Sequence, residues 1–228
     1  MGPAITPEEV IKLLIPFEIN LNRHQLSQLM TYLELLLRWN AKINLTAVRA
    51  PGECVTRHFG ESLYLARWVA LAGANLDIGS GAGFPGLALK IAFPALRTTL
   101  LEPVAKKRAF LKEVIRSCQM EEVEVRAERL ENFVSGVGGV APAGATGDGA
   151  MPFESVTARA VGCAGGVGDL VALARRCLAP GGRLCLWLSH QQSQALEQEE
   201  KGVSWKARFP LPLSSQREIV IGVPSEGQ

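Results

Sequence analysis

A glycine-rich loop between a short apolar run and a helix constrains the fold of this chain more than any other feature. The apolar run ends at Asp77, and residues 78–86 then read Ile-Gly-Ser-Gly-Ala-Gly-Phe-Pro-Gly. Closely spaced glycines let the backbone approach a ligand, and Pro85 suits the first turn of a helix. A buried strand that runs through such a loop into a helix is typical of open α/β sheets that bind nucleotide-like ligands. The sequence therefore predicts an α/β fold with a ligand site at this loop.

The loop allows two interpretations of its ligand. Read from Gly81, the glycines at 81, 83 and 86 form Gly-x-Gly-x-x-Gly, and Glu102 follows about 20 residues later, as in dinucleotide-binding folds. Read from Asp77, the segment is acid-x-Gly-x-Gly-x-Gly, the form in which S-adenosylmethionine-dependent methyltransferases present this loop. Asp77 repels a pyrophosphate and favours a sulfonium or ammonium group. We prefer the second interpretation and keep an NAD(P)-dependent oxidoreductase as the alternative.

The pattern of apolar residues predicts a mostly parallel sheet from residue 75 onward, because short apolar runs alternate there with helical patterns. Helices are expected over 85–92, 104–117, 128–134 and 166–178. Residues 135–151, which are mostly Gly, Ala, Val and Pro, predict a flexible surface insertion. Seven strands are expected, over residues 75–79, 98–102, 123–126, 155–159, 183–188, 203–209 and 217–223.

The chain ahead of the sheet is predicted to be helical. It begins with a Thr-Pro-Glu-Glu capping box, and Asn22 precedes a longer helix whose leucines recur at helical spacing. A third helix is expected over about 52–70, with Glu61 on its solvent side. We therefore expect a helical region over residues 1–72, packed on a ligand-binding domain over residues 73–224.

Composition is that of an ordinary globular protein, with 47% hydrophobic and 20% charged residues. The first 15 residues lack a basic start followed by an apolar run, and no apolar stretch approaches a membrane span, so neither a signal peptide nor a membrane association is expected. Five scattered cysteines without a Cys-x-x-Cys pair favour reduced thiols and a cytoplasmic location. The three histidines lie too far apart in sequence to indicate a metal site.

The distribution of charge is more informative than the net charge of +2. Residues 97–116 carry six basic side chains against two acidic ones, and residues 38–67 carry five against two. Either cluster could be the solvated face of a helix. Two basic clusters that flank a ligand loop also fit the footprint of a nucleic-acid phosphate backbone.

Several motifs in the same order resemble the family of small-subunit ribosomal RNA guanine-N7 methyltransferases, called GidB or RsmG. The resemblance covers about residues 25–190, and Trp-Asn-x-x-x-Asn-Leu-Thr ahead of the glycine loop is its most specific part. The matching segments are 39–49, 57–62, 77–86, 101–111, 129–133 and 157–160. The resemblance implies a Rossmann-like class I methyltransferase fold with a seven-stranded sheet and an N-terminal helical extension. It also implies S-adenosylmethionine as cofactor and 16S ribosomal RNA, naked or within the 30S subunit, as the partner of a monomer.

The residues expected to bind the cofactor follow the carboxyl ends of the strands. The glycines and Phe84 form the loop itself, and Asp77 is expected near the ammonium end of the cofactor's methionine. Glu102 is placed to accept hydrogen bonds from the ribose hydroxyls, as the corresponding acid does in dinucleotide folds. The full set is Asp77, Gly79, Gly81, Gly83, Phe84, Glu102, Leu130, Glu131 and Arg159.

Leu130 and Glu131 correspond to the family's adenine-contacting pair, with Glu128 as the competing acid in another register. Arg159, at the exit of the fourth strand, is the residue expected to position the reacting groups. It would bind the cofactor carboxylate or a substrate phosphate through a bidentate contact. RNA contacts are expected from Arg57, His58 and Lys106, although His58 fits a packing role equally well.

Other parts of the resemblance are interpreted as structural or left open. Buried asparagines commonly satisfy backbone groups, so the segment that contains Trp39, Asn40 and Asn44 is expected to fix the turn that docks the N-terminal helices on the sheet. The family often has Lys-Gly near the end of the fifth strand, where this chain has Ser189-His190. The contribution of the C-terminal third to RNA contact therefore stays open.

Methylation of guanine N7 makes modest demands on side-chain chemistry. N7 carries an in-plane lone pair and no proton, so the enzyme must position the base and exclude water rather than remove a proton. Two further functions are kept as alternatives: a non-catalytic ribosome-assembly factor with a cofactor fold, and a methyltransferase that acts on a small molecule. The second would lack the steep salt dependence that RNA binding shows.

Overall fold

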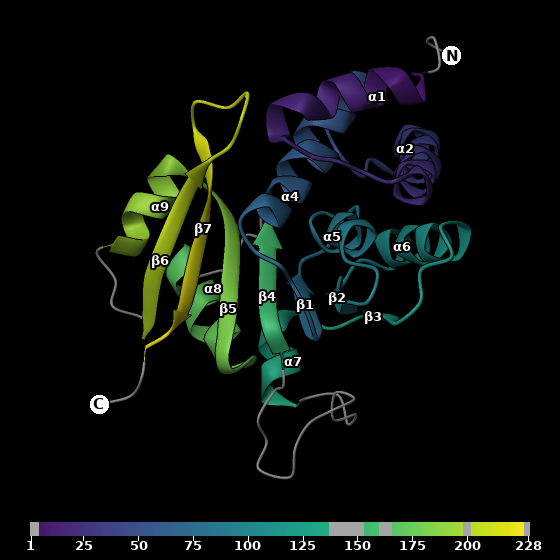
Figure 1. Ribbon diagram of the computed structural model, residues 1–228. Coiled ribbons are helices and arrows are strands. Elements are labelled where there is room, and N and C mark those ends of the chain that lie inside the picture. The colour runs from purple at the N-terminus through teal and green to yellow at the C-terminus, as the bar shows by residue number, and fades with distance from the viewer. Residues whose placement is uncertain (1–4, 137–152, 160–165, 198–201, 226–228) are drawn as a thin grey trace.

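The computed structural model describes residues 5–136, 153–159, 166–197 and 202–225, which form one α/β sheet structure covered by helices (Figure 1). From residue 137 onward, the expected insertion at 135–151 lies outside the described residues. In the described part of the chain, no helix is long and apolar enough to cross a membrane.

Seven strands form a single sheet in the order β3-β2-β1-β4-β5-β7-β6. β1 to β5 are mutually parallel, and β7 runs antiparallel to both β5 and β6. The strand order reverses direction between β1 and β4, and ligands of open α/β sheets bind at such a reversal, outside the carboxyl ends of the strands. All seven predicted strands are confirmed, although β5 begins earlier than expected. The strands are β1 Ala74–Ile78, β2 Arg97–Leu101, β3 Val123–Arg126, β4 Phe153–Arg159, β5 Leu178–Ser189, β6 Val203–Pro210 and β7 Arg217–Pro224.

The helices cover both faces of the sheet (Figure 1). α2 packs against α5 and α6 on one face, whereas α8 packs between α7 and α9 on the other, where all three helices share a buried core with the strands. The structure confirms the predicted helices, including the capping box at Thr6 and the cap at Asn22, which forms a capping box with Gln25. The helix predicted over 166–178 ends at Arg175, and α9 was not predicted. The bounds are α1 Pro7–Leu14, α2 Arg23–Ile43, α3 Pro51–Cys54, α4 Glu61–Leu63, α5 Gly86–Ala92, α6 Ala105–Ser117, α7 Leu130–Ser135, α8 Gly166–Arg175 and α9 His190–Glu197.

The third predicted helix differs from a regular α-helix in a way that matters for the site. Between α3 and α4 the chain forms a π-helix, Val55–Gly60, and after α4 a 3-10 helix, Tyr64–Arg67. The wider π turn changes the angle at which later residues leave the helix axis. The prediction that Glu61 faces solvent was wrong, because its side chain is only 3% exposed and binds two arginines.

The N-terminal helices and the helices on the adjoining face of the sheet share one hydrophobic core. Val10 and Leu14 of α1 and Leu29 of α2 belong to the same buried cluster as Leu87 of α5 and Phe110 of α6. This packing brings α2 and the π-helix directly beside the glycine loop. The proposed division at residues 1–72 and 73–224 stays a prediction.

Candidate active site

A cleft with a volume of about 530 Å³ lies at the carboxyl ends of β1, β4 and β5, within the size range of small-molecule sites. Of the predicted site residues, Arg57, His58, Gly79, Gly81, Phe84 and Arg159 line it. Asp77, Gly83, Glu102, Lys106, Leu130 and Glu131 do not line it. The structure thus gathers half of the predicted residues around one cleft and places the other half behind or beside it.

Two glycines of the loop have different surroundings. Gly81 has a φ angle of 56°, and a Cβ built there would meet only the carbonyl oxygen of Gly79, at 3.7 Å. Gly81 therefore borders open space in the cleft, as a ligand-binding glycine should. A Cβ on Gly83, whose φ angle is 89°, would instead collide with the hydroxyl of Tyr32. Gly83 allows the loop to pack on the helix beneath it, and its contact with a cofactor stays a prediction.

Asp77 lies fully buried beneath the loop. Its Oδ1 accepts a hydrogen bond of 2.8 Å from the Thr157 hydroxyl. Its Oδ2 has no hydrogen-bond partner, the only such buried side-chain atom among the described residues. Burial raises the pKa of Asp77 to about 6. A Cβ on Gly86 would lie 2.7 Å from Oδ2, so the carboxylate sits against the start of α5, and its contact with a cofactor ammonium group stays a prediction.

Glu102 holds the loop from the neighbouring strand. Its Oε2 accepts the backbone N–H of Gly81 at 2.9 Å, and its Oε1 accepts that of Val104 at 2.8 Å. These bonds anchor the loop to the end of β2, and the predicted ribose contact stays untested. Leu130 is part of the buried core and Glu131 is exposed in the first turn of α7, so their adenine contact also stays a prediction.

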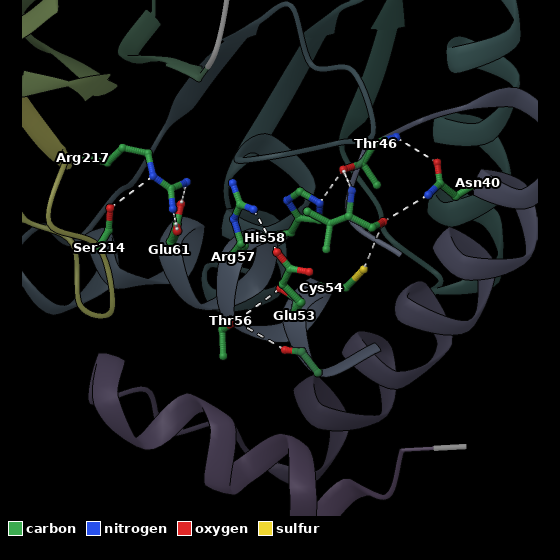
Figure 2. Close-up of polar contacts among 12 residues, drawn as sticks. Asn40, Thr46, Glu53, Cys54, Thr56, Arg57, His58, Glu61, Ser214 and Arg217 are labelled. Carbon is green, nitrogen blue, oxygen red and sulfur yellow. Dashed lines mark hydrogen bonds and ion pairs between the residues drawn. The ribbon is translucent and has the colours of Figure 1, made fainter. Parts of the chain in front are cut away.

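Glu61 joins two arginines from distant parts of the chain on one side of the cleft. Its carboxylate lies 2.9 Å from Nη2 of Arg159 and 2.7 Å from Nη2 of Arg217. Figure 2 shows Arg217 facing Glu61, with Ser214 on its other side. Burial raises the pKa of Glu61, and the two guanidinium groups oppose that rise. Trp187 adds a fourth member, because its indole N–H donates to the backbone carbonyl of Glu61 at 2.7 Å.

Arg159 is more fully engaged by the protein than the sequence suggested. Its Nη1 donates to the His58 carbonyl at 3.4 Å and to the Ser62 hydroxyl at 3.2 Å, and its Nη2 donates to Glu61 and to the Arg57 carbonyl. Both terminal nitrogens therefore already have two acceptors each. A bidentate contact to a carboxylate or phosphate needs these same N–H groups, which in this arrangement bind the wall formed by the π-helix. The contact of Arg159 with a cofactor or a phosphate stays a prediction.

His58 contributes an uncharged ring to the cleft wall. The ring stacks on Phe84 with centroids 4.9 Å apart, and its Nε2 lies 2.8 Å from the hydroxyl of Thr46. Burial, together with nearby Arg159, lowers the pKa of His58 to about 3. The hydrogen bond from His58 to Thr46 continues through the backbone to Asn40, as Figure 2 shows. The site thus contains a neutral imidazole between an aromatic ring and a hydroxyl.

Comparison with known proteins then decides the family. The family model described as "GidB: rRNA small subunit methyltransferase G" matches residues 25–218. The chain belongs to this family. Curated relatives named "Ribosomal RNA small subunit methyltransferase G" include one from Chloroflexus aggregans, 43% identical over 167 residues that span 73% of this chain and 65% of the relative. Another, from Myxococcus xanthus, is 37% identical over 193 residues that span 82% of each chain.

Solved structures support the fold of this GidB chain independently. The structure described as a methyltransferase from Pyrococcus furiosus covers 88% of this chain and 99% of its own, with a TM-score of 0.56 and 18% sequence identity. At that identity the likeness concerns the fold alone. The architecture is that of the Rossmann-like class I methyltransferases, as the sequence predicted.

In this GidB chain the segment that contains Asn40 has the structural role expected of it. The buried side chain of Asn40 donates to the Val48 carbonyl at 3.1 Å and accepts from the Thr46 backbone N–H at 2.9 Å. Asn44 ends α2 in the left-handed conformation. Trp39 packs on Phe110 of α6. These contacts fix the loop that carries Thr46 to the rim of the cleft.

The cations around the cleft include residues that sequence reasoning missed. Arg57 is half exposed and forms an ion pair of 2.9 Å with Glu53, whereas Lys106 is exposed and does not line the cleft. Lys107, its neighbour on α6, lines the cleft instead. One position along a helix turns a side chain by about 100°, so a run of lysines does not reveal which one faces a ligand.

Other missed residues come from the C-terminal third. This part of the GidB chain lines the cleft with Trp187, Leu188, Ser189, Gln192, Leu211 and Arg217. Leu211 and Arg217 have no marker in the sequence, because the β6–β7 hairpin brings them back to the site only in the folded state. The other four lie at or just after the end of β5, at and around the Ser189-His190 position whose role the sequence left open. Thr46 also lines the cleft, and the sequence could have indicated it, since it ends the Asn-Leu-Thr part of the most specific motif.

We expect the low pKa of His58 to appear in the pH dependence of stability. In the unfolded chain the imidazole titrates near 6.5, so the unfolded state binds the proton first as the pH falls. This contribution to the free energy of unfolding is complete above pH 6.5 and is lost as the pH falls toward 3. Urea unfolding between about pH 7 and 5 should show a smaller loss of stability for His58→Gln than for the wild type. Equal losses in the two proteins would contradict the buried neutral imidazole.

Proposed function

We propose that this chain transfers the methyl group of S-adenosylmethionine to N7 of a guanosine in the 16S RNA of the small ribosomal subunit, acting as a cytoplasmic monomer. Its family and its class I fold are those of S-adenosylmethionine-dependent rRNA methyltransferases. The single observation that carries the proposal is the cleft at the glycine loop of a chain whose family match extends over residues 25–218.

The residues at the loop fit the cofactor. Gly81 opens onto the cleft without a side chain, and Gly79 and Ser80 line it beside Gly81. Asp77 lies beneath the loop, and its Oδ2 accepts no hydrogen bond from the protein. Its carboxylate therefore favours a cation nearby and disfavours a pyrophosphate. Phe84 offers an aromatic wall. S-adenosylmethionine would supply a methyl group on a sulfonium cation here, with Asp77, Glu102 and the glycines holding the loop, and with Gly83, Leu130, Glu131 and Arg159 as the further predicted cofactor residues.

The chemistry of the cleft suits an acceptor that needs no deprotonation. Guanine N7 attacks with a free lone pair, so the work of the protein is orientation and exclusion of water. His58 is held neutral by burial, and Arg159 is held by four protein acceptors. Neither group is poised to exchange protons near neutral pH, which agrees with a reaction that depends on positioning.

The rim of the cleft suits a splayed-out RNA base. N7 faces the deep, narrow groove of an A-form duplex, so the target guanosine must leave the helix or lie in a loop. His58, which stacks on Phe84, offers a ring for such a base, and Arg57 and Lys107 place cations at the rim for adjoining phosphates. Lys106, also predicted as an RNA contact, is exposed on α6 and precedes Lys107 in the chain.

The Lys107→Gln variant should bind RNA less tightly and with a weaker salt dependence. Loss of one phosphate contact reduces the slope of log K against log salt by about 1. Filter binding of a 16S fragment over a range of salt concentrations measures this slope. Lys12→Gln, an exposed lysine on α1, is the matched control and should keep the wild-type slope. An unchanged slope for Lys107→Gln together with a reduced slope for Lys106→Gln would show that Lys106, not Lys107, contacts the RNA phosphate.

A ligand-induced shift in melting temperature tests the cofactor. S-adenosylmethionine and S-adenosylhomocysteine should raise the Tm in proportion to the logarithm of their concentration, and NAD and NADP should not. A rise with the dinucleotides alone would favour the oxidoreductase alternative. Tight RNA binding and cofactor binding without methyl incorporation would favour the assembly-factor alternative instead.

A further inference from the structure

Tyr32 of α2 reaches the glycine loop from beneath, although it does not line the cleft. Its side chain is fully buried, and its hydroxyl donates to the carbonyl oxygen of Ala82, 50 residues later in the chain. Burial raises the pKa of Tyr32 well above its usual value, so the hydroxyl stays a donor. A phenylalanine would fill this core position equally well, so packing alone does not require the hydroxyl.

The loop is shaped to accept this hydroxyl. A Cβ on Gly83 would collide with Tyr32 Oη and would lie 2.9 Å from Leu87 of α5. The backbone of Gly83 also has a φ angle of 89°, which side-chain-bearing residues rarely adopt. Gly83 and Tyr32 are therefore complementary, and together they set how close the loop lies to α2.

Tyr32 also begins a stack of planar groups that ends in the wall of the cleft. Its ring lies parallel to that of Phe84, with centroids 5.2 Å apart and an interplanar angle of 5°. Phe84 stacks in turn on His58, and His58 bonds to the Thr46 hydroxyl at 2.8 Å. Phe84, His58 and Thr46 all line the cleft. One buried side chain thus fixes both the loop and the aromatic wall beside it.

We propose that Tyr32 is a positioning residue for cofactor binding: its hydroxyl and ring hold the Ala82–Phe84 segment in the conformation that binds S-adenosylmethionine. This inference rests on the proposed cofactor. It assigns to an N-terminal helix a part of the cofactor site that the loop motif alone does not contain. It also gives Gly83 a purpose other than contact with the ligand.

The Tyr32→Phe variant separates the hydrogen bond from the stacking. Loss of one buried hydrogen bond to the loop should weaken S-adenosylmethionine binding by about five- to tenfold, measured by titration calorimetry at a temperature where every variant is folded. Tyr64→Phe, at the other tyrosine of the chain, should leave the Kd unchanged. Leu36→Val, in the core one turn further along α2, should lower the Tm without changing the Kd. A Kd for Tyr32→Phe within twofold of the wild type would overturn the proposal, as would an equal rise in Kd for Leu36→Val.

A double-mutant cycle gives a second, independent readout. Gly83→Ala alone should weaken binding strongly, because its Cβ meets the Tyr32 hydroxyl. In the Tyr32→Phe/Gly83→Ala double mutant the hydroxyl is gone, so the combined loss should be smaller than the product of the single losses. Strictly multiplicative losses would contradict the coupling. If the wild-type protein bound no S-adenosylmethionine, the proposed cofactor itself would be contradicted. If the wild type bound it and only the Tyr32 variants behaved otherwise than expected, the failure would be confined to the role of Tyr32.

Discussion

Replacement of Glu61 by alanine should lower the free energy of unfolding by about 3 kcal/mol and methyl transfer by at least about tenfold. The carboxylate is 3% exposed and pairs with Arg159 and Arg217, so its removal leaves two guanidinium groups near each other without their shared counter-ion. The mutual repulsion should loosen the wall formed by the π-helix. Urea unfolding measures the first effect, and initial rates at a temperature where the variant is folded measure the second.

The control for Glu61 is an exposed ion pair. Glu113 bonds to Arg116 at 2.8 Å on the surface of α6, so Glu113→Ala should change the stability by no more than about 0.5 kcal/mol. Glu61→Gln keeps the size of the side chain and removes its charge, and should lie between the wild type and Glu61→Ala. A loss below about 1 kcal/mol for Glu61→Ala would contradict the role assigned to the cluster.

Replacement of Gly81 by valine should weaken S-adenosylmethionine binding by at least about 100-fold, because the new side chain projects into the cleft at the loop. A Cβ at this position meets no protein atom nearer than 3.7 Å, so the fold can hold the new side chain. The side chain then occupies space in the cleft that the ligand needs. The positive φ angle of 56° adds a backbone cost of about 1–2 kcal/mol to folding. Calorimetric titration measures the affinity, and urea unfolding measures the stability.

Gly181 provides the matched control for the backbone cost. It has a φ angle of 74° and no atom within 4 Å of a built Cβ, and it does not line the cleft. Gly181→Val should therefore lose a similar amount of stability and keep the wild-type affinity. If both valine variants lost affinity equally, the loss would reflect strain rather than obstruction, and Gly81 would not border the ligand.

The sequence predicted the elements whose signals are local. Most strands contain a short apolar run, and the caps at Thr6 and Asn22 mark where their helices start. The loop after Asp77 has glycines at 79, 81, 83 and 86, all within ten residues. The mostly parallel sheet followed from the alternation of strands and helices, and its seven strands from the resemblance to the family, whereas the order of the strands within the sheet was not predicted. These features depend on residues close together in the chain, so one sequence suffices to find them.

The parts that could not be predicted depend on contacts between distant residues. Glu61 reaches Arg159 across 98 positions and Arg217 across 156, and the π-helix that turns Glu61 inward has no sequence signature of its own. Tyr32 could not be predicted either. Its sequence position indicates only a core residue of α2, and its hydrogen bond to the Ala82 carbonyl appears only in the folded structure. Lys107 rather than Lys106 lines the cleft because of the phase of α6, which the charge pattern does not specify.

Methyl transfer to RNA tests the central claim most directly. Tritiated S-adenosylmethionine is supplied with 30S subunits, with naked 16S RNA and with protein-free controls, and any N7-methylguanosine is located by borohydride and aniline cleavage of the labelled RNA. We expect label in one guanosine of the 16S RNA, with cleavage at that position and none with Gly81→Val. Absence of label from both RNA substrates, or label at a position that resists cleavage, would contradict an N7-specific methyltransferase of small-subunit RNA.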